Sequence, residues 1–136
     1  MKLLLCEDDP GIAEAIAESL RLVGIQVTVC GTYVAAIDSL KRLPFDAVVS
    51  DGQFPGGIRG MSMIGSYGIP LLNEAKTLGR AVVLLSGNDD LVREAKVLGI
   101  PALMKPVKRE QILEALDRQR AEESFRTQSK RRGNGG

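Results

Sequence analysis

Residues 45–57 read FDAVVSDGQFPGG, and this stretch decides the fold class. The apolar run at 47–49 is typical of a strand buried on both faces, as the strands of parallel sheets are. The Gly- and Pro-rich residues after it predict a turn, so Asp51 stands at the carboxyl end of a buried strand. Ligands bind at this edge of open α/β sheets. Because Asp also caps turns for local reasons, functional groups at other strand ends are needed to indicate a site.

The rest of the chain alternates short apolar runs with patterns of helical spacing. Strands are expected at 2–6, 25–30, 47–51, 81–85 and 102–104. Helices are expected at 10–24, 32–43, 70–79, 88–99 and about 108–120. Five strands that alternate with five helices predict an α/β fold, with a parallel sheet and helices on both of its faces. The glycine-rich segment 52–68 interrupts this alternation as a long and unusually apolar loop.

Composition limits the class of protein. The chain has 136 residues, 44% of them hydrophobic and 26% charged, which predicts one globular domain. Neither a leader-like start nor an apolar run of bilayer length is present, so we expect a cytoplasmic protein without membrane contacts. The chain contains no His, which excludes the commonest general base. Cys6 and Cys30 end apolar runs, where buried thiols are expected rather than a redox pair.

Charge is divided unevenly along the chain, whose net charge is +1. Residues 118–136 carry a net charge of +4, and residues 1–117 carry −3. We therefore expect a folded domain at 1–120 and a basic tail at 121–136 that is disordered or the stub of a linker. Nucleic-acid binding through the tail is the less favoured interpretation, because neither an aromatic platform nor a recognition helix accompanies it.

Four strands end in side chains that carry chemistry. Glu7 and Asp8 follow the first strand, Asp51 the third, Ser86 the fourth and Lys105 the fifth. In a parallel sheet these ends lie along one edge. Carboxylates that converge repel one another unless a cation joins them, and hard oxygen ligands favour Mg²⁺. With Asp51 as nucleophile and Lys105 and Ser86 holding the transferred oxygens, the pattern predicts a phosphoryl-accepting site.

Each of these residues also has an ordinary interpretation. The acidic triplet at 7–9 fits a solvated turn and a helix cap, and Asp9 fits a cap better than a ligand. Ser86 fits a loop hydroxyl, and Lys105 fits a surface lysine. It is the coincidence of all of them at strand ends that favours the phosphoryl-accepting site.

Four motifs carry a resemblance to a known family: LLLCEDD at 3–9, VVSDGQFPGG at 48–57, VVLLSGND at 82–89 and MKPV at 104–107. In this order and spacing the chain resembles, over roughly residues 2–120, the receiver domain of response regulators in two-component signalling, the CheY-like family. The resemblance implies a flavodoxin-like, doubly wound, five-stranded parallel sheet of strand order 2-1-3-4-5 with five helices.

The resemblance also implies a role for each site residue. Asp51 would be the phosphoacceptor. The metal ligands would be Asp8 directly, Glu7 largely through water, Asp51 itself and the backbone carbonyl of Gln53. Ser86 and Lys105 would contact the phosphoryl group, and the bond between Lys105 and Pro106 would be cis. Gln53 and Asn88 would tune the lifetime of the phosphorylated state.

Three features differ from a typical receiver. Ala102 occupies a switch position where receivers usually carry an aromatic residue, which leaves open how Ser86 is coupled to the outer face of the fourth and fifth helices. The loop at 52–68 is longer than usual. We expect it to cover part of the acceptor site or to form a partner surface; alternatively Met61, Met63 and Ile64 extend the core under an added helical turn. No effector domain follows, which fits either a stand-alone receiver or a piece of a longer regulator.

The expected function is acceptance of a phosphoryl group on Asp51 from a sensor histidine kinase or phosphotransfer protein, followed by phosphorylation-dependent contacts with a downstream protein. Such a chain would catalyse only its own phosphorylation and dephosphorylation. One alternative is a receiver-like interaction module that works without phosphorylation, which Ala102 favours and the intact acids oppose. The other is a Mg²⁺-dependent aspartyl phosphohydrolase. It is disfavoured because Gly52 and Gln53 follow Asp51, where such enzymes generally place a second carboxylate two positions on.

Overall fold

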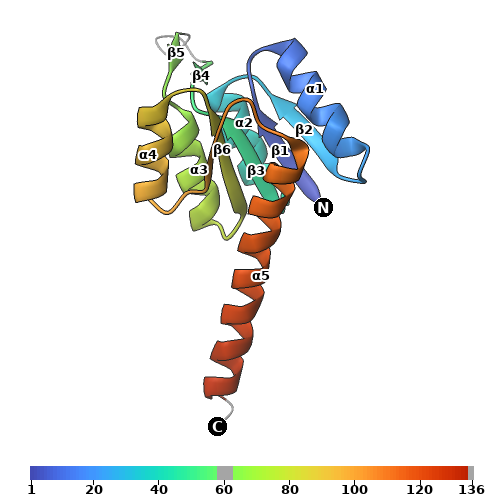
Figure 1. Cartoon of the computed structure of the whole chain (residues 1–136), viewed down its shortest axis with the longest axis vertical. Helices are drawn as coiled ribbons and strands as arrows, with labels where there is room; N and C mark the ends of the chain where they lie inside the picture. The colour runs from blue at the N-terminus through green and yellow to red at the C-terminus, as the bar shows by residue number, and fades with distance from the viewer. Residues whose placement is uncertain (58–62, 135–136) are drawn as a thin grey trace.

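The computed structural model describes residues 1–57 and 63–134 (Figure 1). The elements are β1 (Lys2–Cys6), α1 (Pro10–Arg21), β2 (Gln26–Cys30), α2 (Tyr33–Arg42), β3 (Ala47–Asp51), β4 (Phe54–Pro55), β5 (Ile64–Gly65), α3 (Gly68–Thr77), β6 (Ala81–Ser86), α4 (Asp89–Val97), β7 (Ala102–Met104) and α5 (Arg109–Asn134). Five strands form a parallel sheet in the order β2-β1-β3-β6-β7. With β6 and β7 as its fourth and fifth strands, this is the predicted order, and the predicted fold class is confirmed.

The sheet separates two hydrophobic clusters because successive side chains of a strand point to opposite faces. In β1, Leu4 and Cys6 face one cluster, which also holds buried residues of α2, α3 and α4. Leu3 and Leu5 face the other, which holds buried residues of α1 and α5. Helices therefore cover both faces of the sheet, as the alternation predicted (Figure 1).

Three polar side chains cap helices that begin where the sequence predicted. The Asp9 carboxylate accepts a hydrogen bond from the Ile12 N–H at 3.0 Å. The Thr32 hydroxyl accepts one from the Ala35 N–H at 3.2 Å. The Asn88 side-chain oxygen accepts from two N–H groups at the start of α4. Each cap provides an acceptor for backbone donors that have no partner within the helix.

The segment at 52–68 contains a small antiparallel hairpin in place of a featureless loop. Phe54 and Pro55 of β4 pair with Gly65 and Ile64 of β5. Phe54 is fully buried, and its ring lies 6.2 Å from that of Tyr67. Met63 and Ile64, by contrast, are 81% and 65% exposed. The interpretation that they extend the core is therefore wrong for these two residues, because their side chains face solvent from the hairpin; Met61 lies outside the described residues.

The last helix is longer than predicted. The sequence indicated an end near Arg120, whereas α5 continues to Asn134. The added part is free of Pro and has no Gly before Gly133, and its Ala, Glu, Gln, Lys and Arg residues are good helix formers. Figure 1 shows this part of α5 extending away from the sheet and its covering helices.

Candidate functional site

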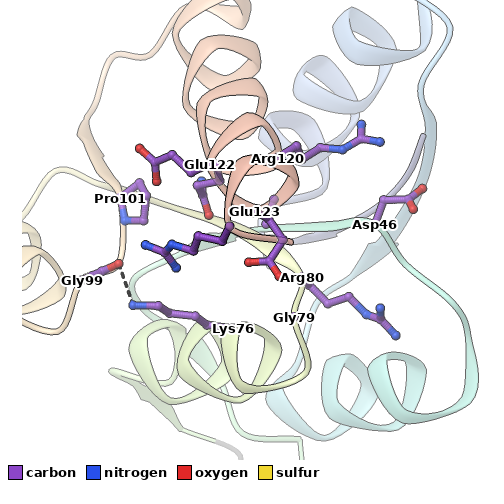
Figure 2. Close-up of a pocket in the computed structure, with 12 residues that line it drawn as sticks. Asp46, Lys76, Gly79, Arg80, Gly99, Pro101, Arg120, Glu122 and Glu123 are labelled. Carbon is purple, nitrogen blue, oxygen red and sulfur yellow. Dashed lines mark hydrogen bonds between the residues drawn. The ribbon is translucent and has the colours of Figure 1, made fainter. Parts of the chain in front are cut away.

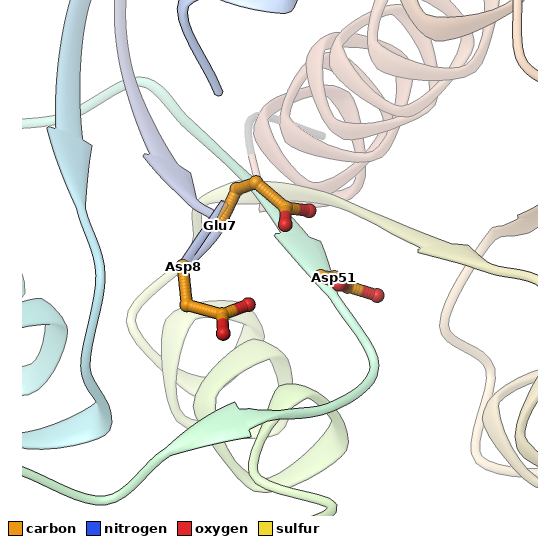
Figure 3. Close-up of side chains that lie close together, drawn as sticks. All are labelled: Glu7, Asp8 and Asp51. Carbon is orange, nitrogen blue, oxygen red and sulfur yellow. The ribbon is translucent and has the colours of Figure 1, made fainter. Parts of the chain in front are cut away.

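Adjacent strands bring the acidic residues together. Glu7 and Asp8 directly follow β1, and Asp51 is the last residue of β3. Cys6 and Ser50 are partners in the register of these parallel strands, so the residues after them leave the sheet side by side. Carboxylate oxygens of Glu7, Asp8 and Asp51 lie within 4.8 Å of one another (Figure 3). The convergence expected from the strand ends is present.

Lys105 adds a positive charge to this group of acids. Its Nζ lies 3.4 Å from Asp51 Oδ1 and 3.6 Å from Glu7 Oε2. The Lys105 N–H donates to the Ser86 carbonyl oxygen at 2.9 Å, which places the lysine beside the end of β6. The peptide bond between Lys105 and Pro106 is cis, as the sequence predicted.

Glu7 lies in an unfavourable place for a negative charge. It is 5% exposed. Burial, followed by the nearby Asp51 carboxylate, raises the pKa of Glu7 to about 7, although the Asp9 N–H and Lys105 oppose the shift. A nearby cation stabilises the ionised form of such a buried carboxyl group, so that it loses its proton and its negative charge is neutralised. The electrostatics of the site thus favour a bound metal ion.

The Asp51 side chain is oriented by its own loop. The Gly52 N–H donates to Asp51 Oδ1 at 2.7 Å. A Cβ atom on Gly52 would lie 3.3 Å from Ser86 Oγ and 2.9 Å from the Leu91 side chain, so a larger residue here would require the Leu91 side chain to shift. Ser86 is 3% exposed, and its Oγ accepts from the Asn88 N–H at 3.0 Å. The predicted hydroxyl group therefore lies next to the loop that follows Asp51.

Gly52 and Gly68 both shape the site, although the sequence indicates only that they lie in a loop. A Cβ atom on Gly68 would lie 2.2 Å from the Asp51 carbonyl oxygen and 2.8 Å from the Gly52 Cα. The first residue of α3 is thus packed on the backbone of the candidate acceptor. A glycine among six in 52–68 gives no local signal of this contact.

The remaining predicted residues lie in the loop after β3, in the loop after β6 and in β7. Gln53 is exposed and directly follows Gly52. Asn88 uses its side-chain oxygen to cap α4. Ala102 is buried in β7, opposite Leu84 of β6. None of these three side chains adds a charge to the cluster of Glu7, Asp8 and Asp51.

The donor set fits Mg²⁺. Three carboxylates supply hard oxygen ligands from neighbouring strand ends, and Mg²⁺ is usually held by one or two carboxylates together with waters and phosphate oxygens. Asp8 and Asp51 are open enough to solvent for such further ligands to enter. His is missing from the sequence and both cysteines are buried, so softer ligands do not compete at this site.

A separate cavity lies at the opposite edge of the sheet. It measures about 480 Å³ and is lined by residues near the amino ends of strands, such as Asp46, Ala81 and Pro101, and by Glu122 and Arg126 of α5 (Figure 2). On its wall Lys76 Nζ donates to the Gly99 carbonyl oxygen at 2.9 Å. Because the acidic group lies at the carboxyl ends of the strands, this cavity is not part of the candidate site.

The family follows from a sequence match. Residues 3–117 match the family model of the response regulator receiver domain. The chain belongs to this family. The receiver is also 37% identical, over 65 residues, to the transcriptional activator protein PfeR of Pseudomonas aeruginosa. That match covers 48% of the receiver and 21% of PfeR, so the chain spans only about a fifth of this relative.

Solved structures share the receiver's fold. A CheY-like receiver domain protein from Methanospirillum hungatei has a TM-score of 0.71 at 23% identity, covering 89% of this chain and 97% of that one. TrrA from Thermotoga maritima, in complex with Mg²⁺ and BeF, has a TM-score of 0.69 at 18% identity, covering 87% and 97%. An adenylate cyclase structure from Rhodopirellula baltica has a TM-score of 0.75 at 22% identity, covering 99% and 98%. At these identities the likeness concerns the fold alone.

In the described part of the receiver, no helix is both long and apolar enough to cross a bilayer.

Proposed function

We propose that this receiver accepts a phosphoryl group on Asp51 in the presence of Mg²⁺ and signals through protein contacts that depend on phosphorylation. The observation that carries the proposal is the gathering of Glu7, Asp8 and Asp51 within 4.8 Å, with Lys105 3.4 Å from Asp51. TrrA, which shares the fold, was solved with Mg²⁺ and BeF. The family match over residues 3–117 supports the same assignment.

Asp51 is suited to act as the nucleophile. Its Oδ1 is held by the Gly52 N–H, which leaves the other oxygen to attack phosphorus. When the donor is a phosphohistidine, an O–P bond forms between Asp51 and phosphorus as the bond from phosphorus to the imidazole nitrogen breaks, and that nitrogen keeps the bonding electron pair. Lys105 lies where it can pair with a transferred phosphoryl oxygen, and the Ser86 hydroxyl can donate to another.

Glu7, Asp8 and Asp51 would hold the metal, together with the backbone carbonyl of Gln53. When bound, Mg²⁺ supplies the positive charge that offsets the negative charges of the acceptor and the phosphoryl group. Binding would also release the proton that the raised pKa of Glu7 retains near neutral pH. Gln53 and Asn88, which flank the site, would set the lifetime of the acyl phosphate.

The donor in this proposal is a phosphohistidine on a sensor histidine kinase or phosphotransfer protein. The sequence of the receiver contains no His, which fits a donor histidine on another protein. These partners fit a cytoplasmic location. In this scheme the receiver has no external turnover substrate and catalyses only its own phosphorylation and dephosphorylation.

Intact mass spectrometry tests the proposal with a small phosphodonor. The protein is incubated with acetyl phosphate, with or without Mg²⁺, and so are Asp51→Asn and a matched control, Asp117→Asn, whose carboxylate is exposed on α5. We expect a labile phosphoryl adduct with Mg²⁺ in the unsubstituted protein and in Asp117→Asn, and none in Asp51→Asn. No adduct in any protein would favour a phosphorylation-independent module, and turnover of an added phosphoester would favour a phosphohydrolase.

A further inference from the structure

One edge of β6 extends beyond the strand that pairs with it. β6 pairs with β7 only from Leu84 onward. On this edge the Leu84 N–H donates to the Pro101 carbonyl oxygen at 2.8 Å, and the Ser86 carbonyl oxygen accepts from the Lys105 N–H at 2.9 Å. Because alternate residues of a strand direct their backbone groups to the same edge, Val82 faces it as well. Its buried N–H and C=O groups need partners from outside the sheet.

Gln119 supplies both partners. Its side-chain oxygen accepts from the Val82 N–H at 2.8 Å, and its side-chain nitrogen donates to the Val82 carbonyl oxygen at 2.8 Å. The same nitrogen donates to the Ala115 carbonyl oxygen at 2.9 Å, one turn earlier in α5. The amide thus takes the place that a peptide group of a longer β7 would occupy, and it joins α5 to the central part of the sheet.

Gln119 also marks the point where α5 leaves the domain. Before it, Ile112 and Leu116 are buried against the sheet. After it, every side chain from 121 to 128 is exposed. We call residues 121–134 the projecting segment. Up to residue 128, where its side chains are described, no ion pair or side-chain hydrogen bond joins it to the domain.

The cavity described above separates the projecting segment from the loops at the base of the sheet. It is lined both by Glu122, Glu123 and Arg126 of the projecting segment and by Arg80 and Pro101 of these loops (Figure 2). The space of about 480 Å³ leaves room for the segment to change its angle. Apart from a contact between the exposed Arg120 guanidinium and Met1 Sδ at 3.4 Å, Gln119 makes the last side-chain hydrogen bonds from the helix to the domain before it enters solvent.

We infer that Gln119 is a positioning residue that couples the angle of the projecting segment to the state of the phosphoryl site through β6. The inference rests on the proposed phosphorylation of Asp51. β6 is buried along its whole length and carries Ser86 at its other end, and a close-packed strand transmits displacements. Ala102 lies opposite Leu84 of β6 and has only a small side chain. The Gln119 amide instead connects to the backbone of β6 at Val82, two residues before Leu84 on the same edge.

The projecting segment would amplify a small movement at Gln119. Residues 121–134 extend for about 21 Å at a rise of about 1.5 Å per residue. A rotation of about 10° at Gln119 would therefore displace the far end by about 4 Å. A shift of this size is large enough to change how a partner or a following domain is presented.

Distances between spin labels at Ala15→Cys in α1 and Gln128→Cys in the projecting segment test the inference. Both positions are exposed, and the native Cys6 and Cys30 are buried, so the introduced thiols can be labelled selectively. Distances are measured with Mg²⁺, with and without beryllofluoride as the phosphoryl mimic. We expect beryllofluoride to shift the mean distance by about 2 Å, because residue 128 lies about 14 Å along the helix from Gln119 and the rotation is about 10°. We expect Gln119→Leu to abolish the shift.

Two further variants sharpen the test. Gln111→Leu is the matched control, because Gln111 accepts from the Lys108 N–H at the start of α5; it should keep the shift. Gln119→Glu keeps the acceptor for the Val82 N–H but loses the donor, and it should reduce the shift. This variant decides the outcome if Gln119→Leu fails to fold.

Uptake of beryllofluoride, followed by fluorine NMR, separates the two proposals. If the unsubstituted receiver takes up none, the proposed function fails. If it takes up beryllofluoride but the label distance stays constant, the coupling through Gln119 is overturned. An equal shift in Gln119→Leu and in the unsubstituted protein would overturn it as well, because a merely structural amide would leave the shift in place.

Discussion

Gly68 packs so closely on Asp51 that a Cβ atom at position 68 would lie 2.2 Å from the Asp51 carbonyl oxygen. The Gly68 N–H also donates to the Gly52 carbonyl oxygen at 3.2 Å. The start of α3 is therefore attached to the loop that orients the candidate acceptor. The position of Asp51 depends on a residue at the far end of segment 52–68.

Gly68→Ala is expected to lower the free energy of unfolding by about 2–3 kcal/mol, because the new methyl group meets backbone atoms that cannot move as a flexible side chain does. Urea unfolding measures the change. Gly87→Ala is the matched control, since a Cβ atom at Gly87 meets nothing within 4 Å. Equal stability of the two variants would contradict the close contact.

Glu7 should make the stability of the metal-free protein depend on pH. Its pKa rises from an ordinary value of 4.5 to about 7 on folding, chiefly through burial. Between these values the folded protein retains a proton that the unfolded chain has lost. Raising the pH across this window therefore lowers the free energy of unfolding, by at most about 3 kcal/mol.

Urea unfolding of the unsubstituted protein and of Glu7→Gln, from pH 5 to pH 8, measures this contribution. The difference between the two should change with pH, since Gln cannot ionise, and added Mg²⁺ should restore stability at pH 8. If both proteins respond identically to pH without metal, Glu7 does not carry the raised pKa.

Asp8 and its neighbour Asp9 should differ sharply in metal binding. Asp8 lies in the group of carboxylates, whereas Asp9 caps α1. Asp8→Asn is expected to weaken Mg²⁺ binding by about tenfold or more, because it removes a charged ligand. Asp9→Asn should leave binding unchanged, as Asn also caps helices. Calorimetric titration with Mg²⁺ distinguishes them, and equal affinities would refute the ligand assignment.

Lys105 should affect phosphorylation more than stability. Its side chain is about a third exposed, with Nζ 3.4 Å from Asp51. Lys105→Met is expected to slow phosphorylation by acetyl phosphate about tenfold, through loss of a charge beside the transferred oxygens. Lys108→Met, which alters an exposed lysine three residues later, serves as the control. Equal rates in the two variants would remove Lys105 from the site.

Much of the fold could be predicted because its signals are local. Buried strands appeared as apolar runs, helices appeared as patterns of helical spacing, and the capping chemistry of Asp9 identified the start of α1. The convergence of Glu7, Asp8 and Asp51 followed from parallel topology, which places strand ends along one edge. These inferences needed only the order of residues and the usual handedness of crossovers.

The features that escaped prediction depend on distant contacts or on very short elements. β4 and β5 have two residues each, which is too few to show a periodic pattern. The hydrogen bond between Val82 and Gln119 spans 37 positions, and the sequence near either residue gives no pattern from which to predict it. The projecting part of α5 has the charged, polar composition of a disordered tail, although the same residues favour a helix once α5 has begun.

Locating the phosphoryl group by chemical trapping tests the central claim most directly. After incubation with Mg²⁺ and acetyl phosphate, borohydride reduces an acyl phosphate to an alcohol, and trypsin then releases the peptide spanning residues 43–59. This peptide contains both Asp46, which directly precedes β3, and Asp51, which is its last residue, so Asp46 is an internal control. We predict that fragmentation places the reduced residue at position 51 alone; reduction at position 46, or at no position, would contradict the claim.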